Sequence, residues 1–137
     1  MTSEAANQIV IVVDDDVSVR ESLRFLLESE GIEVADFASG PSLMASTWPP
    51  RAGCVILDIQ MPEMSGLDLL ERLRETKSTV PVIVVTGQPS PANRARAMSA
   101  GALEVMEKPL NDGRFLRLVR QALNQRHPLP VSGRIAD

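Results

Sequence analysis

The sequence is poor in aromatic residues and in cysteine: its 137 residues include no tyrosine, one tryptophan, three phenylalanines and one cysteine. A single cysteine cannot form an intrachain disulfide. Because Cys54 lies in an apolar run, we interpret it as a small buried hydrophobic residue of a protein from a reducing compartment. We therefore expect the fold to depend on its hydrophobic core and not on covalent cross-links.

Long hydrophobic runs and an excess of basic residues are also missing. The longest wholly apolar stretches are residues 9–13 and 82–85, far short of the roughly 20 residues that span a bilayer. The N-terminus lacks the basic start and apolar core of a signal peptide. The formal net charge of −4 argues against a surface built mainly to bind nucleic acid phosphates. We expect a cytoplasmic protein with no membrane contact and no direct binding of DNA by this chain.

The length of the chain is close to that of a single domain, since domains typically have about 100–200 residues. We predict an N-terminal lead at residues 1–8, one folded domain at residues 9–124 and a flexible C-terminal tail at residues 125–137. The tail contains two prolines and a glycine and has no hydrophobic periodicity. A second folded module is nearly excluded.

Short β-branched runs alternate with amphipathic stretches along the whole chain. The predicted strands are residues 9–13, 32–37, 54–57, 80–85 and 103–106. The predicted helices are residues 17–30, 39–46, a segment with Leu67, Leu70 and Leu73 on its apolar side, 91–100 and 112–125. Two prolines at 49 and 50 predict a loop after the second helix. This alternation predicts an α/β fold with a doubly wound, five-stranded parallel sheet in the order 2-1-3-4-5, a flavodoxin-like topology.

Polar side chains follow four of the five predicted strands. They are Asp14 and Asp15 after the first strand, Asp58 after the third, Thr86 after the fourth and Lys108 after the fifth. In such a sheet the ligand site lies outside the carboxyl ends of the strands. Three carboxylates packed together repel one another unless a cation lies among them, and oxygen ligands without histidine or cysteine favour Mg²⁺ over zinc. Together with one lysine and one Mg²⁺, three carboxylates carry no net charge.

Four short motifs resemble the receiver domain of bacterial two-component response regulators, and in particular the receivers that precede helix-turn-helix output domains. The motifs are Val12-Val13-Asp14-Asp15-Asp16, Leu57-Asp58-Ile59-Gln60-Met61-Pro62 with Gly66, Val84-Val85-Thr86-Gly87, and Lys108-Pro109. The resemblance covers about residues 9–124 and implies that the chain is a signalling switch and not an enzyme, although it catalyses its own phosphorylation and dephosphorylation.

The resemblance also implies a role for each motif residue. Asp58 would accept a phosphoryl group from a phosphohistidine. Asp15, Asp58 and the backbone carbonyl of Gln60 would bind Mg²⁺, with Asp14 acting largely through a water molecule. Lys108 and the Thr86 hydroxyl would contact the phosphoryl oxygens. By the same resemblance we predict a cis peptide bond between Lys108 and Pro109.

The resemblance further implies partners. A sensor histidine kinase or a phosphotransfer protein would supply the phosphoryl group, and an unidentified downstream protein would read the result. A homodimer through the fourth helix, fifth strand and fifth helix is one arrangement that the resemblance leaves open. If the chain is complete, the thirteen residues after 124 are too few for a DNA-binding output domain, and its output is a protein contact or phosphoryl relay. If it is a fragment, a linker begins there.

The chain departs from the family pattern in its switch. Family members place an aromatic residue three positions before the lysine, and here that position is Val105. An aromatic side chain that turns inward therefore cannot report phosphorylation; Met98, Met106 or the loop after Thr86 are the candidates. Gln60 and Gln88 lie where family members tune attack by water on the acyl phosphate, and their amides either orient that water or block it.

Three other functions compete with this interpretation. A phosphatase of the haloacid dehalogenase class needs a second aspartate two residues after the nucleophile, where this chain has Gln60. A flavin or dinucleotide domain needs a phosphate-binding loop after the first strand, where Asp14, Asp15 and Asp16 would repel phosphate. The third alternative is a receiver-like adaptor that binds proteins without being phosphorylated; a binding function alone does not require the acidic pair, Asp58, Thr86 and Lys108.

Overall fold

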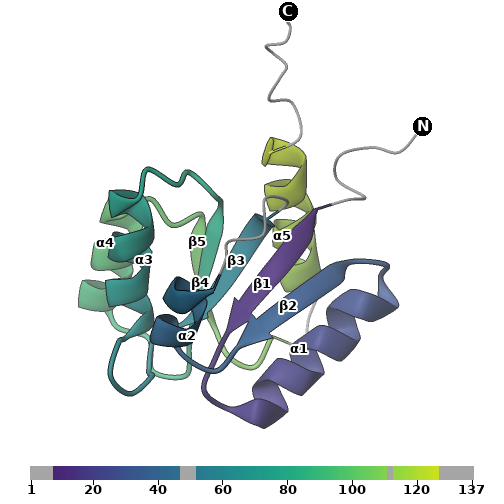
Figure 1. The fold of residues 1–137 in the computed structure, drawn as a ribbon, viewed down its shortest axis with the longest axis horizontal. Coiled ribbons are helices and arrows are strands. Elements are labelled where there is room, and N and C mark those ends of the chain that lie inside the picture. Colours follow the sequence, from purple (N-terminus) through teal and green to yellow (C-terminus); the bar gives the residue numbers. More distant parts are fainter. Residues whose placement is uncertain (1–7, 47–51, 111–112, 127–137) are drawn as a thin grey trace, which may run out of the picture.

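The computed structural model describes residues 8–46, 52–110 and 113–126, which form five strands and five helices in strict alternation. All strand pairs are parallel, and the sheet order is β2-β1-β3-β4-β5 (Figure 1), as the sequence predicts. The strands are β1 Ile9–Val13, β2 Glu33–Phe37, β3 Ala52–Asp58, β4 Val82–Thr86 and β5 Glu104–Glu107. The helices are α1 Val17–Ser29, α2 Gly40–Ala45, α3 Gly66–Glu75, α4 Pro91–Ser99 and α5 Gly113–Arg126. Within the described residues, no helix combines the length and apolar character needed to cross a bilayer.

Helices cover both faces of the sheet, which explains why the central strands are apolar throughout. Val10 and Val12 of β1 pack in one cluster with residues of α1 and α5, including Leu27 and Phe115. Two of the other three residues of β1 belong to a second cluster, together with residues of α2, α3 and α4. Figure 1 shows α1 and α5 on one side of the sheet and the other three helices on the opposite side. Successive strand side chains point to opposite faces, so a central strand needs apolar residues at every position.

The first acidic turn is fixed by the start of α1. Asp16 is the N-cap of this helix, and its side chain accepts hydrogen bonds from the backbone N–H groups of Ser18 and Val19. Such a cap stabilises a helix by about 1 kcal/mol. Asp14 and Asp15 are therefore held in a short turn between the end of β1 and a capped helix.

Two strands begin two residues away from the start that the sequence pattern predicts, and β2 and β5 begin one residue away. β4 begins at Val82 and not at residue 80, because Pro81 has no N–H group to donate to a neighbouring strand. β3 begins at Ala52, two residues early, and its pairing with β1 shifts register between Ile9 and Val10. The predicted loop at residues 48–51 and nearly all of the predicted lead and tail lie outside the described residues. Cys54 is fully buried, as predicted, and burial raises the pKa of its thiol to about 12.

Candidate functional site

Three carboxylates meet at the carboxyl edge of β1 and β3. Asp14 and Asp15 follow β1, and Asp58 is the last residue of β3. One carboxylate oxygen from each of the three lies within 4.8 Å of the other two. Asp14 and Asp58 are only 1% and 3% exposed, whereas Asp15 is exposed to solvent. The structure thus brings together the three acidic residues that the sequence singled out. Two of them are buried, and the third is exposed at the edge of the cluster.

Lys108 reaches this cluster from the end of β5. Its Nζ atom lies 3.0 Å from Oδ2 of Asp14 and 3.1 Å from Oδ1 of Asp58. The peptide bond from Lys108 to Pro109 is cis, as predicted, and the Lys108 backbone N–H donates to the Thr86 carbonyl over 2.8 Å. Burial alone lowers the pKa of Lys108, but its contacts with Asp14 and Asp58 outweigh burial and raise the pKa overall. The ammonium group is therefore charged wherever these two carboxylates are.

One lysine does not balance three carboxylates. Burial and the neighbouring charge of Asp14 raise the pKa of Asp58 above its ordinary value, although Lys108 partly offsets both effects. Oδ2 of Asp14 is buried, and apart from the Lys108 ammonium 3.0 Å away no described group donates a hydrogen bond to it. A buried oxygen in this state and an excess of negative charge fit a hard divalent cation such as Mg²⁺. Among the described residues, this is the only group of three or more acidic, histidine or cysteine side chains placed to hold a metal ion.

Gly66 supports the backbone that carries Asp58. It is the first residue of α3, and its N–H donates to the Ile59 carbonyl over 3.1 Å. A Cβ atom at this position would overlap the backbone carbonyl oxygen of Asp58 and lie 2.8 Å from the carbonyl carbon. The sequence motif includes Gly66, but only the structure shows that α3 approaches the end of β3 too closely for any side chain there.

The hydroxyl group of Thr86 is hydrogen-bonded within the protein. It is fully buried at the end of β4, and its Oγ1 donates a hydrogen bond to Oε1 of Gln60 over 2.8 Å. The same oxygen accepts a hydrogen bond from the backbone N–H of Gln88 over 2.9 Å. The sequence assigned a role to the backbone carbonyl of Gln60, and it missed the contact that the side chain makes with Thr86.

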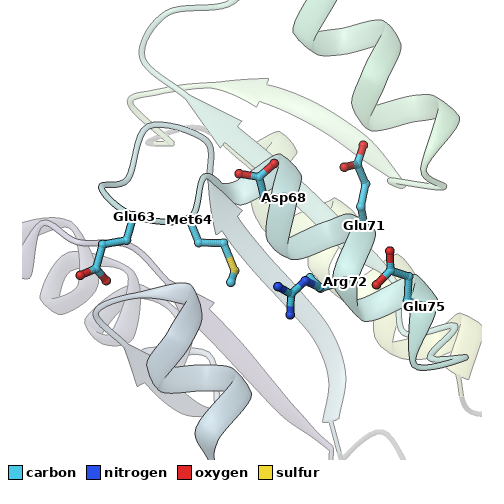
Figure 2. Close-up of a pocket in the computed structure, with 6 residues that line it drawn as sticks. All are labelled: Glu63, Met64, Asp68, Glu71, Arg72 and Glu75. Carbon is cyan, nitrogen blue, oxygen red and sulfur yellow. The ribbon is translucent and has the colours of Figure 1, made fainter.

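A second acidic region lies along α3. A hollow of about 320 Å³ is lined by Glu63, Met64, Asp68, Glu71, Arg72 and Glu75 (Figure 2). Asp68 and Glu71 each accept a 2.8 Å hydrogen bond from the guanidinium group of Arg96 in α4. These two carboxylates are thus paired with an arginine at the exposed surface.

Comparison with known proteins identifies relatives whose sequences match most of the chain. The model of the response regulator receiver domain matches residues 10–120. The chain is 40% identical over 116 residues to the transcriptional regulatory protein FixJ of Azorhizobium caulinodans, which covers 85% of this chain and 55% of that protein. It is 37% identical over 118 residues to nodulation protein W of Bradyrhizobium diazoefficiens, covering 86% and 52%.

Solved structures agree with these matches. The crystal structure of a response regulator receiver protein from Pseudoalteromonas atlantica superposes with a TM-score of 0.81 at 28% identity, covering 86% of this chain and 98% of that chain. Our chain spans about half the length of the curated relatives it matches. The family model, the sheet order and the acidic cluster with its lysine agree, and the chain belongs to the response regulator receiver domains of two-component systems.

Proposed function

We propose that Asp58 accepts a phosphoryl group from the phosphohistidine of a sensor histidine kinase or phosphotransfer protein, and that the resulting change signals to a downstream protein. The observation that carries this proposal is the position of Asp58: its carboxylate lies 3.1 Å from the Lys108 ammonium and within 4.8 Å of the oxygens of Asp14 and Asp15. A carboxylate surrounded by a cation and metal-binding oxygens is suited to phosphoryl transfer, where catalysis is mainly positioning and charge stabilisation.

The transfer itself needs one nucleophile and one leaving group. An oxygen of the Asp58 carboxylate attacks phosphorus, and the bond between phosphorus and the histidine nitrogen breaks. The electron pair of that bond stays on the imidazole, whose other ring nitrogen carries a proton, so the products are an aspartyl phosphate and a neutral histidine. Asp58 must be ionised to attack, and Lys108 favours this state against the effect of burial.

Asp15, Asp58 and the Gln60 backbone carbonyl would hold Mg²⁺, and Asp14 would take part through a water molecule. When bound, the ion neutralises charge on the phosphoryl oxygens. Lys108, which already lies between Asp14 and Asp58, supplies a second positive charge to the same oxygens. The Thr86 hydroxyl supplies a hydrogen bond to one of them after transfer.

We also propose that the receiver extends over residues 9–124, with a lead and a tail outside it. The family model supports most of this range, since it matches residues 10–120. The proposed binding surface for a downstream protein or a second copy of the chain is formed by the edge strand β5 and by the helices α4 and α5.

Incubation with Mg²⁺ and a small phosphodonor such as acetyl phosphate tests the proposal. Intact mass spectrometry should show a gain of one phosphoryl group in the wild type and none in Asp58→Asn. Asp36→Asn is a matched control, because Asp36 is a partly buried aspartate of β2 outside the acidic cluster; it should be phosphorylated like the wild type. No gain in the wild type would favour the adaptor function instead. A gain that persists in Asp58→Asn would show that Asp58 is not the acceptor.

A further inference from the structure

The hydroxyl group of Thr86 donates one hydrogen bond and accepts another in this structure. Its single proton is donated to Oε1 of Gln60 at 2.8 Å, and its oxygen accepts from the Gln88 backbone at 2.9 Å. A hydroxyl group has only one proton to donate. A phosphoryl oxygen on Asp58 can therefore accept this hydrogen bond only after the bond from Thr86 to Gln60 has broken.

Gln60 is placed for such an exchange. It lies two residues after Asp58, in the loop between β3 and α3, and it is exposed to solvent apart from this contact with buried Thr86. A charged phosphoryl oxygen is a stronger acceptor than a neutral amide oxygen, since hydrogen bonds to ionised groups are roughly twice as strong as neutral ones. Once the bond breaks, the Gln60 amide can hydrogen-bond to water, so it is not left unsatisfied.

Val105 makes this exchange more important here than in receivers with an aromatic switch. Val105 pairs with Val84 in the β4–β5 ladder and packs against the hydrophobic cluster of α2, α3 and α4. It has neither a ring to rotate nor a polar atom to follow the Thr86 hydroxyl. The described partners of that hydroxyl are Gln60 and the Gln88 backbone, and of these two only Gln60 contributes a side chain.

We propose that Gln60 is a positioning residue that holds the Thr86 hydroxyl in the unphosphorylated state, and that transfer of this hydrogen bond from Gln60 to the phosphoryl group is the first step of the switch. The proposal rests on the proposed function of Asp58. It predicts that the Gln60 side chain opposes the phosphorylated state, because its bond must be broken before that state can form.

Binding of a phosphoryl mimic measures this opposition directly. The probe is beryllium fluoride with saturating Mg²⁺, and its affinity is measured by isothermal titration calorimetry. Gln60→Ala should bind the mimic about fivefold more tightly than the wild type, the effect of removing one competing neutral hydrogen bond. Gln60→Met keeps the length of the side chain but lacks the amide oxygen, and it should give the same result. It replaces the alanine variant if that variant folds poorly. The exposed Gln121 of α5 provides the control, Gln121→Ala, which should not change the affinity.

A double-mutant cycle separates the exchange from a structural effect. In a Thr86→Val background the substitution Gln60→Ala should no longer tighten binding of the mimic, because the hydroxyl for which the two acceptors compete is gone.

The outcomes distinguish this inference from the function on which it rests. Unchanged or weaker binding of the mimic by both Gln60 variants, or tightening that persists without the Thr86 hydroxyl, would overturn the role of Gln60 while leaving Asp58 as acceptor. If the wild-type protein neither binds the mimic nor gains a phosphoryl group, the proposed function fails and the hydrogen-bond exchange fails with it.

Discussion

Gly66 at the start of α3 leaves no room for a side chain beside Asp58, because a Cβ atom there would overlap the Asp58 backbone carbonyl. The contact is with backbone and not with the flexible end of a side chain, so the neighbour cannot move aside without displacing the end of β3. Asp58, the proposed phosphoacceptor, is thus positioned by Gly66, a residue that has no side-chain functional group.

We expect Gly66→Ala to lower the free energy of unfolding by about 1–3 kcal/mol, the usual cost of forcing extra atoms into a packed site. It should also slow phosphorylation of Asp58, because the β3 end must shift. Urea unfolding and the rate of phosphoryl gain measure the two effects. Gly87→Ala is the stability control, since a Cβ atom at Gly87 would meet no atom within 4 Å. Equal stability of the two variants would contradict this account.

Replacement of Asp58 by asparagine should stabilise the protein when divalent cations are absent. Burial and the charge of Asp14 raise the pKa of Asp58 above its ordinary value of 3.8, so the ionised form is less favourable in the folded state than in the unfolded chain. Stability is therefore lost in the wild type as the pH rises through the folded-state pKa. The asparagine side chain does not ionise, so the variant avoids this loss.

Thermal unfolding with a chelator between pH 3 and pH 7.5 tests this expectation. The difference between Asp58→Asn and the wild type should be small near pH 3, where the carboxyl is mostly protonated in both states, and should grow toward neutral pH. A constant difference across this range would show that the effect does not come from ionisation of Asp58.

Mg²⁺ should raise the melting temperature of the wild-type protein. A ligand that binds only the folded state stabilises it by about 2.7 kcal/mol at a concentration 100 times its Kd. Asp15→Asn should lose most of this gain without disturbing the core, because Asp15 is exposed. Glu21→Gln, at an exposed acidic position of α1 outside the cluster, should keep it. An equal Mg²⁺ response in both variants would remove Asp15 from the metal site.

Two arginines that link α3 and α4 should differ in their effect on stability. Arg74 donates hydrogen bonds to four backbone carbonyls, those of Ser78, Val80, Ala100 and Gly101. Arg96 pairs with Asp68 and Glu71 on the exposed surface. Arg74→Ala leaves partly buried carbonyls without a donor and should cost about 2–4 kcal/mol, whereas Arg96→Ala should cost less than about 1 kcal/mol and lose its effect at high salt. Denaturant unfolding at low and high salt provides the comparison.

The sequence was sufficient to predict the strand order and the acidic edge, because both follow from local patterns. Apolar runs that end in aspartate, threonine or lysine place those residues at one edge once the strands are known to be parallel. The bond between Gln60 and Thr86 could not be predicted in this way, since it joins residues 26 positions apart through side-chain rotamers of a loop and a strand end. The same holds for Arg74, which reaches carbonyls 26 and 27 residues away. The close approach at Gly66 depends on how α3 packs, and the residue type alone does not reveal it.

The proposed site is divided between two halves of the sheet. Its acidic residues come from β1 and β3, and its hydroxyl and ammonium groups come from β4 and β5 (Figure 1). The seam between β3 and β4 therefore runs through the site. A ligand that draws Thr86 and Lys108 toward Asp58 pulls one half of the sheet against the other along this seam. If Asp58 is phosphorylated as proposed, a protein bound to the outer strand β5 and its flanking helices would detect the change without contacting an acidic residue.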